Sequence, residues 1–219
     1  MASIFAIGLV ASIPSTASAE GLLQAGSQDG WGVTFGYAGM KIGGSGSSFV
    51  HSTHSDDVRF LGAGSAGETD LGDEVLDFGS IGFRYQRKLM KNVIFNAEVG
   101  WMGGDGRDEK QNINDPRPAA NGSFIYSKLE NAVYVGVGFS YSIPNVKGLY
   151  VGADVQSTSL FIEHGWSRFG SDQAEEDSVE WMPAFCPKVG FAFSENMAIE
   201  GSAVIGESVG GAVKFILTF

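Results

Sequence analysis

Six charged residues are the clearest candidates for chemistry, because each interrupts a segment of alternating apolar and small residues. Three are basic and three are acidic: Arg84, Lys188, Lys214, Glu98, Asp154 and Glu200. A charge in an apolar setting is tolerated only when an opposite charge pairs with it. Equal numbers of the two signs allow complete pairing, so the set predicts a salt-bridge network that fills an interior. The alternative is a polar gate in a narrow pore.

A nucleophile with an adjacent base is a second possibility. His51 and His54 lie beside Ser52 and Ser55, and these residue types carry acyl-transfer catalysis when an acid orients the histidine. Spacing fixes no acid near them, and the segment is rich in Ser and Gly, so we predict no catalytic residue. The single Cys186 excludes an intramolecular disulfide and is expected to be a small strand residue.

Other motifs point away from ligand binding. Gly62–Gly67 matches the spacing G-x-G-x-x-G, but it falls in a loop rather than between a strand and a helix, which argues against a dinucleotide site. His164 stands apart from the other histidines and is expected to be solvated. Among the clustered carboxylates, Asp70, Asp73 and Glu74 are the nearest candidates for a divalent cation, but EF-hand spacing is absent. We expect neither a metal centre nor a cofactor.

The distribution of charge is uneven along the chain. The formal net charge is −11, which argues against nucleic-acid binding because that requires a basic footprint. The acidic excess lies in long connections at about 47–74, 103–123 and 159–178, whereas the short connection 87–92 is basic. This distribution predicts an acidic fringe at one end of the molecule.

Period-2 alternation is the main structural signal, and no segment keeps a helical period. The long connections alternate with short ones at 87–92, 143–148 and 194–196. Antiparallel strands of even number, with tight turns at one end and long loops at the other, are typical of a transmembrane β-barrel. The predicted fold class is therefore all-β: an eight-stranded antiparallel up-and-down transmembrane barrel. Its strands are expected at 31–42, 75–86, 93–102, 124–142, 149–158, 179–193, 197–206 and 210–219.

Large aromatic side chains gather on one face of these strands, near the strand ends, as in the interfacial girdles of membrane barrels. They are Trp31, Tyr37, Tyr85, Trp101, Tyr141, Trp181 and Phe193. The opposite face carries Gly, Ser, Ala and the six charges, which suits a tight interior. Strand neighbourhood predicts the pairs Arg84–Glu98, Asp154–Lys188 and Glu200–Lys214. A soluble barrel with its apolar face around a ligand cavity is the alternative.

Two prolines fall within a predicted strand. Pro183 and Pro187 lie in the segment 179–193, and each lacks the backbone donor that a central strand needs. They predict a bulge or a local break in that strand.

Both ends of the chain carry export signals. Residues 1–19 are uncharged and combine an apolar run with Ala17-Ser18-Ala19, which predicts a cleaved signal peptide, although Lys and Arg are missing before the run. Residues 20–29 are expected to be a short periplasmic segment and 30–219 the barrel domain. At the other end, Val213, Phe215, Leu217 and Phe219 share one face of the closing strand and are expected to act as the assembly signal.

With these features the chain resembles the eight-stranded outer-membrane β-barrel family of the OmpA-transmembrane, OmpX and Opa type, often called the porin family. The resemblance rests on the signal peptide, the strand that opens at Trp31, the loop asymmetry and the terminal Phe219. Lys214 stands where the family's assembly signal usually has Gly.

The resemblance implies a location in the bacterial outer membrane, with lipid, lipopolysaccharide and the assembly machinery as partners. It favours a non-enzymatic surface protein that displays acidic loops for envelope integrity or adhesion, with a host or surface ligand. A narrow small-solute channel is the first alternative. Because some small outer-membrane barrels modify lipid A, a lipid A-modifying enzyme is the second.

Overall fold

A computed structural model describes residues 30–42, 48–51, 67–73, 75–112, 122–168 and 171–219. The predicted signal peptide and the segment 20–29 lie outside the described residues and remain predictions. The elements are β1 Gly30–Ile42, β2 Ser48–His51, β3 Gly67–Asp70, the 3-10 helix η1 Leu71–Asp73, β4 Val75–Met90, β5 Val93–Gln111, β6 Phe124–Ser142, β7 Leu149–Arg168, β8 Ser171–Ala192, β9 Met197–Gly206 and β10 Ser208–Thr218.

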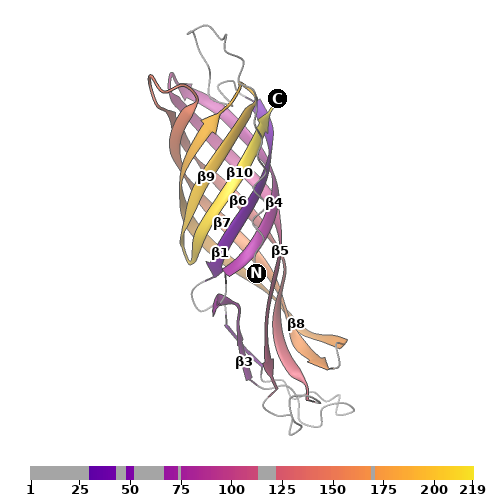
Figure 1. Ribbon diagram of the computed structural model, residues 1–219. Helices are drawn as coiled ribbons and strands as arrows, with labels where there is room; N and C mark the ends of the chain where they lie inside the picture. The colour runs from indigo at the N-terminus through magenta and orange to yellow at the C-terminus, as the bar shows by residue number, and fades with distance from the viewer. Residues whose placement is uncertain (1–29, 43–47, 52–66, 74, 113–121, 169–170) are drawn as a thin grey trace.

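Eight of these strands close into a barrel in the order β1-β10-β9-β8-β7-β6-β5-β4 (Figure 1). Each strand pairs antiparallel with the strands before and after it, and β1 closes the ring between β4 and β10. Phe35, for example, is opposite Ile81 on one side and Phe215 on the other. The closed ring of eight antiparallel strands confirms the predicted fold class. The short strands β2 and β3 pair only with each other, as a separate two-stranded sheet.

The outer face of the barrel is apolar. Trp31, Trp181 and Phe139 are 60%, 65% and 53% exposed, and the valines between them are also exposed. Ring contacts join Trp31 to Tyr85 at 5.1 Å between centroids. Soluble monomers rarely expose an apolar surface of this extent, and the soluble alternative required this face to point inward. The outer wall therefore belongs in the hydrocarbon of a membrane.

No helix among the described residues is long and apolar enough to cross a membrane.

The strands β5 to β8 continue well past the barrel and form a protruding four-stranded sheet (Figure 1). The connections predicted at 103–123 and 159–178 are therefore largely strand: β5 reaches Gln111, β7 reaches Arg168 and β8 begins at Ser171. Register shifts occur at Met102/Gly106 and at Leu129/Asn131, where the sheet leaves the barrel. Bulges of this kind redirect strands at barrel rims.

The prolines coincide with gaps in strand pairing. Pro183 lies beyond the end of β9, whose last partner on β8 is Ala184. Pairing with β9 then lapses between Phe185 and Lys188, which spans Pro187. The structure thus shows a local break without a change of register, at a position where a residue without an N–H is tolerated.

Candidate functional site

The six predicted lumen charges form one connected network inside the barrel. Lys188 Nζ lies 2.7 Å from Asp154 Oδ1, and Lys214 Nζ lies 2.8 Å from Glu98 Oε1. Arg84 Nη1 lies 3.2 Å from Glu200 Oε2 and 3.8 Å from Glu98 Oε2. Lys188 also approaches Glu200 Oε2 at 3.7 Å. Most of these side chains are almost fully buried, so the charges satisfy one another rather than water.

The partners differ in part from those predicted from neighbouring strands. Asp154 pairs with Lys188 as expected, but no ion pair joins Glu200 to Lys214 among the described residues, although the two are opposite each other in register. Lys214 instead reaches Glu98, and Glu200 is held by Arg84. A long side chain inside a narrow barrel can cross the lumen, so strand adjacency alone does not select its partner.

Tyrosines complete this network, and sequence reasoning missed them. Tyr134 Oη donates to Glu98 Oε1 at 2.5 Å, and Tyr150 Oη donates to Glu200 Oε2 at 3.2 Å. Glycines make room for them: a Cβ at Gly100 would lie 2.5 Å from the Tyr134 ring, and one at Gly190 would lie 2.1 Å from that of Tyr150. The available signal was strand parity, because both tyrosines fall on the face opposite the aromatic girdle.

An apolar layer fills the half of the lumen toward the long connections. Its buried side chains include Met40, Phe78, Met102, Leu160 and Met182. The prediction of a Gly, Ser, Ala and charged interior is therefore wrong for this half. Both halves of the lumen are occupied by side chains, which leaves a packed core rather than an open water path.

The protruding sheet, β2 and β3 share a row of polar side chains, most of them buried, which we call the outer-mouth row. Thr69 Oγ1 lies 3.1 Å from His51 Nε2 and 2.5 Å from Ser127 Oγ. His164 Nδ1 lies 2.7 Å from Ser127 Oγ, and His164 Nε2 lies 2.8 Å from Ser178 Oγ. The row connects β2, β3, β6, β7 and β8.

His164 is not solvated as predicted. It is 4% exposed, and the ring of Phe49 stacks on it with 3.8 Å between centroids. Burial, reinforced by the nearby His51, lowers the pKa of His164 to about 4. The imidazole is therefore neutral near pH 7 and holds its hydrogen bonds as donor and acceptor.

The outer-mouth row has a base next to a hydroxyl but lacks the remaining part of a catalytic triad. The third position beside His164 is the hydroxyl of Ser127, whereas a triad places a carboxylate there to stabilise the imidazolium. Of the predicted His/Ser candidates, only His51 lies among the described residues, and it is buried. Ser52, His54 and Ser55 lie outside them. The arrangement is better suited to holding β2 and β3 against the protruding sheet than to catalysis.

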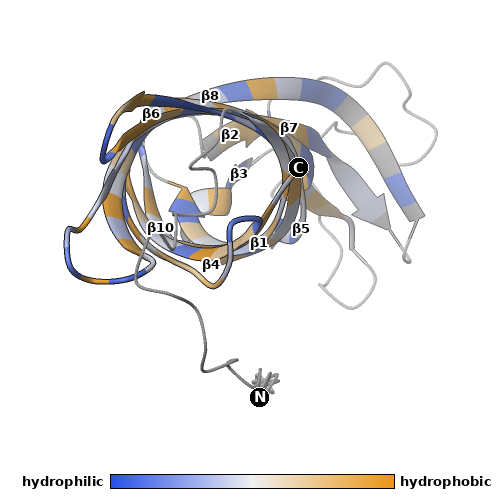
Figure 2. Cartoon of the chain, turned by 90° about the horizontal axis from the view of Figure 1, so that it is seen from above, coloured by the Kyte–Doolittle hydropathy of each residue, from blue (hydrophilic) through white to orange (hydrophobic). Residues whose placement is uncertain are grey.

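The row fastens β2 and β3 across the loop end of the barrel, where Figure 2 shows both strands within the ring. Asp70 N donates to Asp108 Oδ2 at 2.6 Å, which ties β3 to β5. Next to it, Leu71 of η1 is buried in the apolar layer of the lumen. The two short strands and η1 therefore cover the outer mouth. They lie within 47–74, which was predicted to be a long connection.

An ion-pair clamp crosses one face of the protruding sheet. Arg107 on β5 contacts Asp172 on β8 through two bonds of 2.7 and 3.1 Å, and its guanidinium lies 4.3 Å from the centre of the Tyr126 ring. The hydrogen bond from Arg107 lowers the pKa of Asp172 below its usual value. Tyr126 Oη donates to Glu163 Oε1 at 2.5 Å, and burial followed by this bond raises the pKa of Tyr126. The clamp spans β5 to β8.

The remaining predicted positions show no ligand geometry. Asp70 Oδ1 accepts from Gly72 N at 2.7 Å, and Glu74 lies outside the described residues. Within the described part of the chain, no three His, Cys, Asp or Glu side chains gather as a metal site. On the closing strand, Val213 is exposed on the outer wall, and Phe219 N donates to Trp31 O at 2.9 Å. The assembly role of Val213, Phe215, Leu217 and Phe219 remains a prediction.

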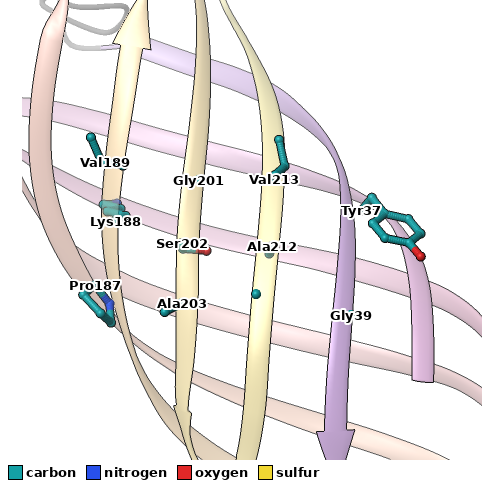
Figure 3. A pocket seen from close by; sticks show the side chains of 11 residues that line it. Tyr37, Gly39, Pro187, Lys188, Val189, Gly201, Ser202, Ala203, Ala212 and Val213 are labelled. Carbon is teal, nitrogen blue, oxygen red and sulfur yellow. The ribbon is translucent and has the colours of Figure 1, made fainter. Parts of the chain in front are cut away.

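A hollow in the outer wall crosses β1, β10, β9 and β8 (Figure 3). Its floor includes Gly39, Gly211 and Ala203, which are opposite one another in register, and Pro187 of β8. Lys188 borders it but is directed to Asp154 in the lumen. The lining also includes Tyr37 and Ser202, so the hollow has few polar side chains among small and apolar ones.

Comparison with known proteins finds no matching family model and no matching curated protein. Similar solved structures include Ail, the attachment invasion locus protein of Yersinia pestis, in complex with the heparin analogue sucrose octasulfate; it has 11% identity and a TM-score of 0.44, over 87% of this chain and 98% of that chain. A second structure of Ail has 10% identity, the same TM-score and the same coverage. Neisserial surface protein A has 10% identity and a TM-score of 0.32, over 86% and 97% of the two chains. At this similarity, the assignment of function depends on the chain's own residues and geometry.

Proposed function

We propose that this chain is a non-enzymatic outer-membrane surface protein of a Gram-negative bacterium, which binds an extended basic segment of a partner at its protruding sheet. The observation that carries the proposal is the edge of β8. This strand begins at Ser171, but β9 pairs with it only from Ala184 onward. Among the described residues, no strand pairs with the outer edge of β8 between these points.

An unpaired strand edge can accept an additional strand from a partner through main-chain hydrogen bonds. Acidic side chains on the edge strand oppose pairing with a second copy and favour a partner that carries positive charge. Glu176 and Asp177 are both exposed along this strand, whereas Asp172 is paired with Arg107. The acidic charge and the unpaired backbone edge therefore both favour a basic, extended ligand. Such a ligand is consistent with a role in adhesion or in linking the envelope.

The packed lumen opposes the channel alternative. Water or a solute would have to displace both the charge network and the apolar layer with Leu71 above it. The lipid A-modifying alternative lacks support for a different reason: the Ser178–His164 pair has no orienting carboxylate in its row. Lipopolysaccharide, the outer-membrane lipids and the assembly machinery remain proposed partners because of the apolar outer wall and the closing strand.

The test uses a short synthetic peptide of alternating lysine and threonine with the barrel refolded in detergent. Hydrogen–deuterium exchange should show new protection in β8 between Asp172 and Met182. The variant Glu176→Lys/Asp177→Lys should bind at least about tenfold more weakly, because like charges would then meet at the edge. The variant Glu195→Lys/Glu207→Lys changes the net charge equally at other connections and should bind as the wild type does. Absence of protection on β8 would overturn the proposal, as would an equal loss in both variants.

A further inference from the structure

The opposite end of the barrel carries an amphipathic turn between β4 and β5. Arg87, Lys88 and Lys91 surround Leu89 and Met90, and all five side chains are exposed. Leu89 is 50% and Met90 70% exposed. Three cations around two exposed apolar side chains form a combination that suits the boundary between lipid headgroups and acyl chains.

The position of Arg87 fits this boundary. It follows Tyr85 by two residues on the same strand face, so it lies about 7 Å beyond that residue along β4. Tyr85 is in ring contact with Trp31 at 5.1 Å, within the aromatic girdle. Arg87 is also opposite Phe95, which contacts Phe139 at 5.7 Å. The guanidinium group of Arg87 therefore lies at the edge of the aromatic girdle, at the level of the lipid phosphates.

A neighbouring turn extends the same surface. Ser142 N donates to Asn92 O at 2.9 Å, which joins the β4–β5 turn to the β6–β7 turn. The second turn adds exposed Lys147 and exposed Val146. The β8–β9 turn at the same end carries Glu195 instead. Positive charge is therefore concentrated beside β4 to β7.

We propose that these two turns form a binding patch for anionic phospholipid of the phosphatidylglycerol class, in the leaflet at the short-turn end. The proposal rests on the membrane placement in the proposed function but not on any surface ligand. Arg87, Lys88, Lys91 and Lys147 attract the phosphodiester charge, while Leu89, Met90 and Val146 enter the acyl boundary. Lipopolysaccharide phosphates have similar charge, but the acidic end of this chain faces that leaflet.

The test measures how strongly phosphatidylglycerol is preferred beside the patch. In a variant that keeps Trp31 and carries Trp101→Phe, Trp166→Phe and Trp181→Phe, brominated phospholipids quench the fluorescence of Trp31 when they lie next to it. Brominated phosphatidylglycerol is compared with brominated phosphatidylcholine in vesicles. We expect a relative binding constant of about 3 or more in favour of phosphatidylglycerol, lost at high salt because surface charges are then screened.

Matched triple variants separate the patch from the overall charge. In the same background, Arg87→Gln/Lys88→Gln/Lys91→Gln should bring the relative binding constant to about 1, whereas Lys41→Gln/Lys110→Gln/Lys128→Gln, with an equal charge change toward the other end, should leave it unchanged. Equal quenching by the two lipids in the parent would overturn the proposal. A preference that survives the first triple variant would overturn it as well. If the barrel folds into vesicles but shows no preference for phosphatidylglycerol, the membrane placement stands and only the lipid patch is wrong. Loss of peptide binding at β8 would instead contradict the proposed surface ligand and would not bear on the patch.

Discussion

Two ion pairs in this molecule show how strongly solvent exposure determines the contribution of an ion pair to the stability of the fold. Arg107 Nη1 lies 2.7 Å from Asp172 in the protruding sheet, closer than the 3.2 Å between Arg84 Nη1 and Glu200 in the lumen. The first pair has side chains that are 28% and 39% exposed, and the second has side chains that are 2% and 3% exposed. Distance alone would rank the Arg107 pair higher.

The physical ranking is the reverse. Water screens the Arg107 pair and can replace either partner when the other is removed, so an exposed pair contributes little. In the lumen no water replaces a missing partner, and the remaining charge is left buried. The comparison therefore teaches that the lumen pair is the one the fold depends on, although its geometry is less favourable.

Removing Arg84 is the largest expected effect. Arg84→Met leaves Lys188, at 3.7 Å, as the remaining cation within 4 Å of Glu200 among the described residues, and the loss in free energy of unfolding should be about 3–5 kcal/mol. Urea titration of the barrel in lipid vesicles measures it. The double variant Arg84→Met/Glu200→Gln should recover much of the loss, because one buried charge of each sign is then removed. Equal stability of the single and double variants would contradict the network.

The barrel could be predicted from the sequence because lipid contact forces a strict alternation on each strand. Trp31, Phe35 and Val135 mark the outer face, and a shift of one residue would expose every lumen side chain to lipid. The charges were found for the same reason, since a charged residue on a small-residue face needs a partner. Their partners were not fully predicted, because Arg84 and Lys214 reach across a lumen whose cross-section the sequence does not specify.

The protruding sheet was missed because its charged residues make the strands look like loops. Leu160, Ile162 and His164 do share one buried face, so the alternation continues past the membrane. Acidic neighbours such as Glu163 obscured it. The β2–β3 pair carries little pattern in strands of four residues each, and its position depends on Thr69 and His51 meeting Ser127 and His164, which only tertiary structure brings together.

Acidification should affect the outer-mouth row before the lumen. The pKa of His164 is about 4 in the folded protein, below its ordinary value of about 6.5. A histidine whose folded pKa is depressed contributes stability that is present above pH 6.5 and is lost as the pH falls toward 4. His51 and Asp177 are the titratable groups that act on it.

Hydrogen–deuterium exchange, corrected for the intrinsic effect of pH, should therefore show β3 opening between pH 6.5 and 4 while β1 and β10 stay protected. The variant His164→Gln keeps a polar side chain that does not titrate in this range, and it should weaken the pH dependence of β3 exchange. An unchanged pH profile in that variant would assign the effect to another group.

The smallest expected effect is at the Arg107 clamp. Arg107→Met removes a half-exposed ion pair and the cation over Tyr126, and together these should lower stability by about 1 kcal/mol. The loss should be confined to the protruding sheet, because the clamp links β5 to β8 beyond the barrel. Faster amide exchange in residues 106–111 and 171–178, with an unchanged urea midpoint for the barrel, would fit this expectation.

Lys110→Met is the matched control, because it breaks the 3.2 Å pair with Asp108 on the same strand without touching the clamp. If Arg107→Met destabilised the barrel as much as Arg84→Met does, solvent exposure would not be what separates the two pairs, and the protruding sheet would have to be regarded as part of the barrel's cooperative unit.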